Sequence, residues 1–392
     1  MCCGFVIIFV TAMYKLWIII FFILPLVGMV YSLWHVWHIL PIPNIYKYIV
    51  VGILATVVCW FFGNFAIFNI DHWPMPLARA SYQIGNSAIF ILMYTVLIFI
   101  ALDLAYLAHI LPRSFLVDSW KGTLSVAAVL MAIFIFGYFQ YRNKVRVPIK
   151  LQTNKTTGSV KKIVMVSDLH VGYHIDRKEL SSWVDKINDE NADLILIGGD
   201  IIDGRMRPLI EENMAEEFRR FNAPVYACIG NHEYYAGKKA AEKFYREANI
   251  NLLIDQTVTV KGINIIGRDD RTNEKRCSLK DLTGHLDMRK FTILLDHQPY
   301  HLEQAEEAGI DFQLSGHTHY GQMWPINWIE DVIYEKAYGA LTKGNTQYYI
   351  SSGIGIWGAK FRLGTQSEYV VAQLPITIKQ NTAKNKRDRN AN

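Results

Sequence analysis

Cysteine is scarce in this chain of 392 residues, and its few cysteines form no recognisable pattern. Cys2, Cys3 and Cys59 fall in the apolar N-terminal part, whereas Cys228 and Cys277 lie beyond it. Their spacing is typical of neither a disulfide framework nor a thiolate zinc site. We therefore exclude a disulfide-stapled fold and a zinc-finger module, and we assign these cysteines no role.

Charged residues are missing from four long stretches of the N-terminal part. Asp, Glu, Lys and Arg are absent from residues 16–46, 48–70, 80–102 and 122–141. Each stretch is long enough to cross a bilayer as a helix, which takes about 20 residues. A buried soluble bundle is the alternative, but the short connections containing Pro and Trp favour membrane helices. We predict an all-α transmembrane anchor at 1–141, with helices near 16–38, 46–70, 86–111 and 120–141.

A cleavable signal peptide is not evident, because the apolar stretch exceeds the usual signal core and lacks a clear small-residue cleavage site. We expect the anchor to be retained, with Met1 or Met13 as its start. Short-loop basic residues decide the orientation. One side would hold Lys15, Arg79, Arg142, Lys144, Arg146 and Lys150, and the other Lys47, Arg113 and Lys121. This predicts a multi-pass cell-membrane protein with both termini in the cytoplasm, provided that the number of helices is even.

The pattern changes after Tyr141. Short β-branched runs ending in Gly, Asp or His alternate with helix-periodic segments such as 177–189 and 208–221, which predicts a globular α/β domain. We place a basic linker at 142–158, this domain at 159–376 and a basic tail at 377–392. Solvation or attraction to the lipid bilayer explains such a tail better than nucleic-acid binding, so we expect no nucleic-acid partner.

Polar side chains follow five of these β-branched runs. Asp168 and His170 lie two residues apart, a spacing that points both side chains to one face of an extended chain. The other clusters are Asp200 with Asp203, Asn231 with His232, His297, and His317 with His319. A cap, a turn or an exposed loop would explain each cluster alone. Five clusters at five strand ends favour a shared site, because ligands gather at the carboxyl ends of strands.

The predicted ligand set combines carboxylate and amide oxygens with imidazole nitrogens. Such a set suits Mn²⁺, Fe or Zn²⁺ better than a metal that prefers thiolates. The residues are numerous enough for two divalent metal ions.

In order along the chain, the motifs D-x-H, G-D-x-x-D, G-N-H-E, a lone His and G-H-T-H resemble those of the calcineurin-like metallophosphoesterase superfamily. The resemblance covers roughly residues 160–375, and the membrane segment is similar, less specifically, to anchors of some membrane-bound bacterial relatives. It implies a metallophosphoesterase β-sandwich flanked by helices. It also implies that Asp168, His170 and His319 hold one metal, that Asn231, His297 and His317 hold the other, and that Asp200 bridges them.

The implied chemistry is hydrolysis of a phosphodiester or pyrophosphate. Two cations about 3.5–4 Å apart bind the phosphate oxygens and lower the pKa of a bridging water to form hydroxide. His232 follows the ligand Asn231, so we predict that it donates a proton to the leaving oxygen. Asp203 would orient His232 and favour its protonated form. Glu233 is expected to be a supporting residue.

Three arginines have two interpretations. Arg268, Arg271 and Arg362 lie in charge-dense or glycine-rich turns, where solvated loops are the simpler explanation. Each of them is also a candidate contact for a substrate phosphate.

The substrate class is narrowed by two further positions. Protein serine/threonine phosphatases of the superfamily carry arginine where this chain has Gly204 and Ile229, which counts against a phosphoprotein substrate. Tethering favours a lipid-linked substrate, such as a phospholipid or a UDP-linked acylated sugar, and a soluble phosphodiester remains an option. The alternative function is a catalytically inactive metal-binding membrane scaffold, which the loss of a ligand or proton donor would indicate. None is missing.

Overall fold

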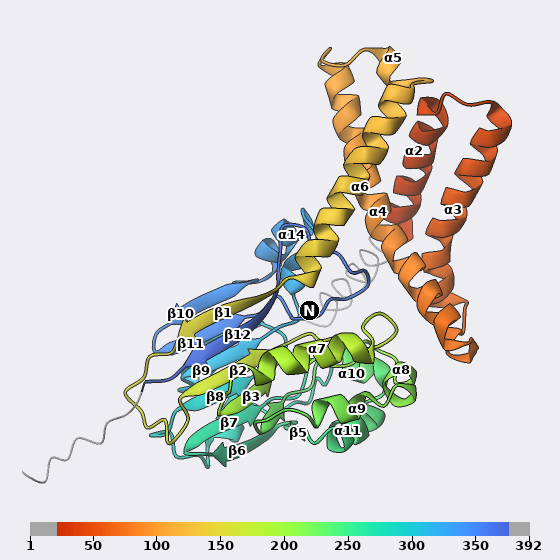
Figure 1. Cartoon of the computed structure of the whole chain (residues 1–392). Helices are drawn as coiled ribbons and strands as arrows, with labels where there is room; N and C mark the ends of the chain where they lie inside the picture. Colours follow the sequence, from red (N-terminus) through yellow and green to blue (C-terminus); the bar gives the residue numbers. More distant parts are fainter. Residues whose placement is uncertain (1–21, 376–392) are drawn as a thin grey trace, which may run out of the picture. The chain divides into compact units, whose positions relative to one another are not determined.

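A computed structural model describes residues 22–375 and divides the chain into two compact units (Figure 1). The helical unit contains the described residues up to Tyr141 together with Gly358–Phe361, and the second unit contains the described remainder. The predicted start at Met13, the basic residue Lys15 and the tail at 377–392 lie outside the described residues.

The helical unit is built from the charge-poor stretches. Three of its helices are long and apolar enough to cross a membrane, judged over residues 22–375. A fourth apolar helix, α2, has 16 residues, and its predicted start near residue 16 lies outside the described part. The helices are α2 (Leu24–Ile39), α3 (Asn44–Ala66), η2 (Ile70–His72), α4 (Met75–Leu107), α5 (Arg113–Leu116) and α6 (Trp120–Arg142).

Helix α4 begins at Met75, well before the expected start near residue 86. The expectation followed the charge-free stretch, but the helix continues through Arg79 back to Pro74 and Pro76, and proline is favourable in a first turn. Inside the bundle, the Asp103 carboxylate accepts a hydrogen bond from Tyr31 Oη at 2.6 Å and lies 3.0 Å from His35 Nε2. Polar groups in apolar surroundings need such partners.

The second unit contains two six-stranded sheets. The first has the order β1 (Lys144–Lys150), β12 (Ser367–Gln373), β2 (Lys162–Val166), β3 (Leu194–Ile197), β4 (Val225–Ala227) and β5 (Asn251–Leu252). The second has the order β10 (Gly339–Lys343), β11 (Thr346–Ile350), β9 (Phe312–Ser315), β8 (Thr292–Leu295), β7 (Ile263–Gly267) and β6 (Gln256–Val260). The pairs from β2 to β5 are parallel, as are those joining β7, β8, β9 and β11.

Strand β1 corrects the predicted linker at 142–158. Residues 144–150 pair in parallel with β12 at the edge of the first sheet. The alternation of valine and isoleucine with basic residues in KVRVPIK is a strand pattern that the basic composition obscured. Pro148 fits this place, because an edge strand tolerates a missing backbone donor.

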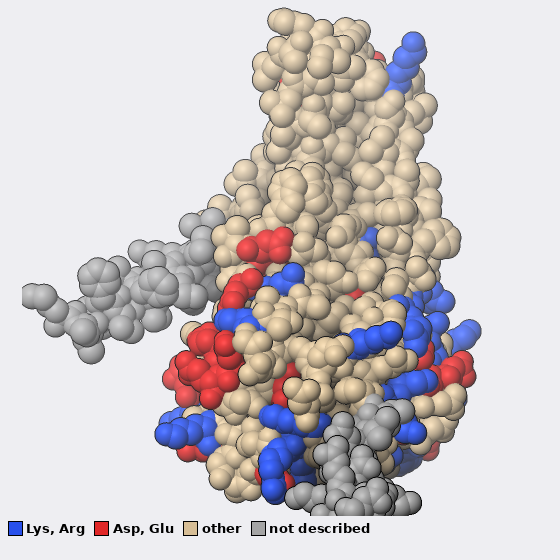
Figure 2. Space-filling model, turned by 90° about the vertical axis from the view of Figure 1, so that its left-hand side faces the viewer, with Lys and Arg blue, Asp and Glu red and all other residues tan. Residues whose placement is uncertain are grey.

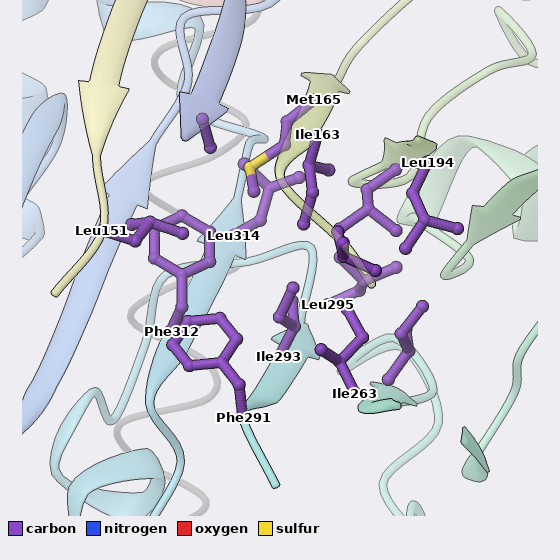
Figure 3. Close-up of a cluster of buried hydrophobic side chains, with 14 of the residues drawn as sticks. Leu151, Ile163, Met165, Leu194, Ile263, Phe291, Ile293, Leu295, Phe312 and Leu314 are labelled. Carbon is purple, nitrogen blue, oxygen red and sulfur yellow. The ribbon is translucent and has the colours of Figure 1, made fainter. Parts of the chain in front are cut away.

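The core lies between the two sheets (Figure 3). Ile163 and Met165 of β2 and Leu194 of β3 belong to the same buried cluster as Ile293 and Leu295 of β8. Every second residue of these strands contributes, as expected for a sheet that buries a face. The β-sandwich implied by the resemblance is therefore confirmed, and a doubly wound single sheet is excluded.

Helices flank this sandwich. They are α7 (Arg177–Asn188), α8 (Arg207–Glu211), α9 (Met214–Phe218), α10 (Asn231–Ala236), α11 (Lys238–Glu247), α12 (Leu279–Thr283), α13 (Glu303–Glu307), η3 (His319–Gly321) and α14 (Ile326–Ile333). Asp176 caps α7 by accepting from the Glu179 N–H at 2.8 Å. The helix expected at 208–221 is divided into α8 and α9, because Asn213 takes a left-handed backbone conformation. Charged side chains cluster over this unit and are sparse over the helical unit (Figure 2).

Candidate metal centre

The parallel strands bring the predicted site residues to one edge of the sandwich. Asp168 and His170 follow β2, Asp200 and Asp203 follow β3, and Asn231 and His232 begin α10 after β4. From the second sheet, His297 follows β8, while His317 and His319 follow β9. Carboxyl ends of parallel neighbours share an edge, so distant segments of the chain meet here.

Three groups of these side chains are close enough to hold an ion. They are Asp168, His170 and His319; His170, Asp200 and His232; and Asp200, His297 and His317. In each group the ligand atoms lie within 4.8 Å of one another. The first and third groups have the composition that the resemblance implies for two separate metals, and Asp200 joins the third group to the second.

The first group has separations that suit one cation. His170 Nε2 lies 3.0 Å from His319 Nε2 and 3.9 Å from Asp168 Oδ1, and His319 Nε2 lies 3.5 Å from the same oxygen. Ligand atoms that are each about 2.1 Å from one ion are separated by about 3.0 Å at right angles and by at most about 4.2 Å. The three separations fall inside this interval, so these residues fit a bound divalent metal.

Asp200 occupies the middle of the cluster. Its Oδ2 atom lies 3.1 Å from His297 Nε2 and 3.7 Å from His170 Nε2. Its other oxygen, Oδ1, accepts a hydrogen bond from the His232 backbone N–H at 2.9 Å. One carboxylate therefore faces the histidines of two different groups.

The histidines are prepared for binding by their hydrogen bonds. His297 Nδ1 lies 2.7 Å from the Gly198 carbonyl oxygen and donates its proton there, so Nε2, which faces Asp200, is the ring nitrogen available to a cation. The Asn231 side-chain oxygen is buried with no hydrogen-bond partner. A buried acceptor without a donor destabilises the folded state unless a cation binds to it.

The electrostatics of the site also favour cations. Burial lowers the pKa of His317 to about 4, assisted by His297, and burial together with His170 and Arg362 lowers that of His319 well below its usual value. Both rings are therefore neutral ligands at pH 7. Burial alone would lower the pKa of His170, but Asp203 and Asp200 outweigh it and raise the pKa. The carboxylates thus attract positive charge to this position.

The predicted acid His232 is the most accessible of the four histidine side chains His170, His232, His297 and His319, at 14% exposure. Its Nδ1 atom lies 3.8 Å from Asp203 Oδ1, whereas His170 Nδ1 lies only 3.3 Å from that oxygen. Asp203 is thus positioned between the two rings and contacts His170 more closely. Burial is the main cause that lowers the pKa of His232.

Strained backbone supports the cluster. Asp168, His170, Asp200, His317 and His319 all have positive φ, between 47° and 72°. Such conformations cost roughly 1–3 kcal/mol each and concentrate at functional sites. The prediction that Asp168 and His170 project from an extended backbone is therefore wrong, because both have a positive φ. Their side chains nevertheless converge on one group.

Glu233 and Ser167 support the candidate ligands through contacts that the sequence alone does not specify. The fully buried Glu233 carboxylate accepts from the backbone N–H groups of Gly230, Asp200 and Ile202 at 2.8–3.2 Å. The Ser167 hydroxyl donates to Asp168 Oδ2 at 2.6 Å. The capping-box spacing of Gly230 and Glu233 was the available signal, because a Glu at this position commonly accepts from the N-cap backbone.

Two of the three candidate phosphate-binding arginines are structural. Arg362 is fully buried and donates to the backbone carbonyls of His319, Ser352 and Gly355. Arg268 is buried and pairs with Asp296 at 3.2 Å. These contacts contradict the solvated-loop interpretation for both residues and occupy their guanidinium groups. Arg271 lies 3.9 Å above the Tyr300 ring.

Comparisons with known proteins identify relatives of this chain. The family model for calcineurin-like phosphoesterases matches residues 161–321. A metallophosphoesterase of Helicobacter pylori is 30% identical over 272 residues, which cover 66% of this chain and 73% of that protein. A Campylobacter jejuni metallophosphoesterase is 28% identical, covering 64% of this chain and 69% of its own.

A transmembrane protein with a metallophosphoesterase domain from Bos taurus is 28% identical, covering 53% of this chain and 51% of that protein. Among solved structures, a 5'-nucleotidase precursor from Thermus thermophilus aligns with a TM-score of 0.36 at 13% identity, and the alignment spans 55% of each chain.

The sandwich and its edge of histidines and aspartates define a phosphoesterase-type hydrolase with candidate divalent-metal ligands. The chain belongs to the calcineurin-like phosphoesterase family.

Proposed function

We propose that this protein is a membrane-anchored hydrolase that uses two divalent metal ions to cleave a phosphodiester or pyrophosphate bond. The observation that carries the proposal is the position of Asp200 Oδ2, which faces His297 at 3.1 Å and His170 at 3.7 Å. A carboxylate between two sets of ligands is what a dinuclear site requires. Bound Mn²⁺, Fe or Zn²⁺ ions would supply Lewis acidity towards the phosphate oxygens and an activated water.

Each residue then has a proposed role. Asp168, His170 and His319 would hold one ion, Asn231, His297 and His317 would hold the other, and Asp200 would be shared by both. His232, accessible and anchored by its backbone N–H on Asp200, donates a proton to the leaving oxygen. Burial lowers the pKa of His232, so its protonated ring gives up a proton readily. An anionic phosphate bound beside the ring would favour its protonation before the reaction. Asp203 positions the rings of His170 and His232.

The anchor and the substrate are part of the same proposal. The helices α3, α4 and α6 cross the cell membrane, together with α2, and the basic residues near their ends keep the phosphoesterase unit in the cytoplasm. A substrate at the bilayer, such as a lipid-linked phosphodiester or pyrophosphate, suits this tether. A reporter fused to the C-terminus tests the orientation, since cytoplasmic activity is expected and activity on the opposite side contradicts it.

The activity is tested with the full-length protein in detergent, using bis-p-nitrophenyl phosphate and added Mn²⁺. We expect hydrolysis, loss to background in Asp200→Asn, and a fall of about 10²–10⁴-fold in His232→Ala. His301→Ala is the matched control, because His301 is an exposed histidine that pairs with Glu303 outside the site. Activity that survives both site substitutions would refute the assigned roles, and no hydrolysis with bound metal would favour the inactive scaffold.

A further inference from the structure

An apolar face lies directly beside the metal centre, on helix α14. Trp328 and Val332 are spaced four residues apart, as are Ile329 and Ile333, so these four project on adjoining rows of one helical face. Trp324 lies just before the helix, with its ring centroid 5.3 Å from that of Trp328. All five are exposed, with Trp328 at 60% and Val332 at 86%. Apolar side chains concentrated in this way on a short helix mark an interaction surface.

The helix is fixed rigidly to the candidate active site. It begins shortly after η3, which carries His319, and the Tyr320 hydroxyl lies 3.1 Å from the Asp331 carboxylate. Asn327 on the opposite side is buried against Gly321, where an added Cβ would meet the Asn327 nitrogen at 2.4 Å. Whatever binds the apolar face is therefore held next to a predicted metal ligand.

The acidic residues of α14 do not occupy this face. Asp331 turns to Tyr320, and the Glu330 Oε2 atom is buried. Burial, with the neighbouring Asp331, also raises the pKa of Glu330 to about 7, so its carboxyl group is partly neutral at physiological pH. The outward rows are thus tryptophan and branched aliphatic side chains, the composition of helices that lie at a membrane interface.

Chain connectivity favours the bilayer as the partner of this face. Gly358–Phe361 belong to the helical unit, where the Phe361 ring lies 4.8 Å from that of Phe134 on α6. Just after this segment, the Leu363 carbonyl accepts from the Trp324 N–H at 2.7 Å, and Leu363 also forms a bridge with Met323. The residues just before α14 are thus hydrogen-bonded to Leu363, which follows in sequence only two residues after the segment assigned to the unit with the candidate membrane spans.

We infer that the apolar face of α14 lies in the headgroup region of the bilayer that the chain itself spans, and that it presents the metal centre to phosphoesters carried by lipids. The docking inference depends only on the exposed apolar residues and on the covalent link to the membrane-spanning unit. The substrate class also rests on the proposed function, because it requires the neighbouring site to hydrolyse phosphoesters. A second copy of the chain is the competing occupant of the face, and the experiment separates the two.

Docking is tested by fluorescence in reconstituted full-length protein. A cysteine placed by Val332→Cys, in a background whose native cysteines are replaced by alanine, is labelled with an environment-sensitive nitrobenzoxadiazole dye. Ile210→Cys on α8 is the matched control, because Ile210 is also an exposed aliphatic residue of the same unit. In phosphatidylcholine vesicles we expect headgroup-region spin-labelled lipid to quench the dye at position 332 and not at position 210.

Absence of quenching at position 332 overturns the inference. A dye response that instead appears in detergent and grows with protein concentration also overturns it, because it identifies a second chain as the partner. Neither result depends on catalysis, so failure of the docking inference is distinguishable from failure of the proposed function.

The substrate class is tested with two substrates that share one leaving group. Bis-p-nitrophenyl phosphate is soluble, whereas the p-nitrophenyl phosphodiester of dioleoylglycerol is presented in phosphatidylcholine vesicles. We expect Val332→Glu to lower kcat/KM for the lipid substrate about tenfold, because a charge replaces one apolar anchor. The soluble substrate should change by less than about twofold, since Val332 packs against little.

Ile210→Glu is expected to leave both substrates unchanged. Equal losses on the two substrates in Val332→Glu would contradict the inference, as would unchanged hydrolysis of the lipid substrate. A wild-type protein that cleaves neither substrate refutes the proposed function, while the quenching experiment still decides the docking.

Discussion

Gly230→Ala is the substitution that probes the geometry of the metal centre most selectively. Gly230 has φ −110° and ψ −174°, which alanine adopts without strain. A Cβ atom at this position would nevertheless lie 2.1 Å from Asp200 Oδ1 and 2.7 Å from the Asp200 nitrogen. Contacts below 3.0 Å are essentially never seen for Cβ atoms, so the Asp200 carboxylate must move by about 1 Å.

The size of the effect follows from that displacement. Crowding of this kind destabilises a protein by about 1–3 kcal/mol, which lowers the Tm by about 2–4 °C per kcal/mol in a unit of this size. A 1 Å misplacement in a catalytic arrangement reduces the rate by about 10²-fold. We therefore expect a folded protein with a moderately lower Tm and a far larger loss of activity.

The assay combines thermal unfolding of the full-length protein with hydrolysis of bis-p-nitrophenyl phosphate in the presence of Mn²⁺. Gly284→Ala is the matched control, because Gly284 has a helical φ of −57° and an added Cβ would make ordinary contacts of 3.4 Å or more. The control should retain both stability and activity. Activity of Gly230→Ala within about twofold of the wild type would refute the reasoning, because the shared carboxylate would then tolerate displacement.

Three further predictions concern the groups that support the site. Arg362→Met should destabilise the protein by roughly 3 kcal/mol or more in urea unfolding, because several buried carbonyls lose their donor, whereas Arg289→Met, at an exposed arginine, should change stability little. In protein stripped of metal, burial and Asp200 raise the pKa of Glu233 to about 7 from an ordinary 4.5. The raised value means that protonated Glu233 stabilises the fold below about pH 4.5 and that this contribution is lost as the pH rises through about 7. Unfolding free energies measured across this window should therefore fall with pH more steeply than in Glu233→Gln, and parallel curves would contradict the assignment. Adding Mn²⁺ to the stripped protein should stabilise it with the logarithm of the free ion concentration, by about 2.7 kcal/mol for one site at one hundred times the Kd, and the Tm should rise accordingly. An unchanged Tm would count against a metal site.

The sequence indicated which residues come together better than it indicated their local geometry. Asp168, Asp200 and His297 were recognisable because each follows a β-branched run and carries a metal-binding side chain. The left-handed backbone of Asp168 and Asp200 was not predictable, because non-glycine residues adopt it only where the surrounding contacts enforce it. Those contacts join segments far apart in the sequence, such as the Glu233 carboxylate with the Asp200 N–H.

The fold, too, was predictable from local patterns but not in its long-range contacts. Apolar runs indicated the core strands and the membrane helices, since hydrophobic periodicity is a local property. The pairing of β1 with β12 joins residues 144–150 to residues 367–373, and no local pattern specifies such a partner. Arg362 likewise looked like a loop cation, because its burial depends on carbonyl groups supplied by other turns.

The central claim is that Asp200 is shared by two cations, and metal stoichiometry tests it most directly. Full-length protein loaded with Mn²⁺, freed of excess ion and measured by elemental mass spectrometry should contain two ions per chain, and Asp200→Asn should lose affinity for both. A stoichiometry of one in the wild type, or two ions retained in Asp200→Asn, would contradict the account.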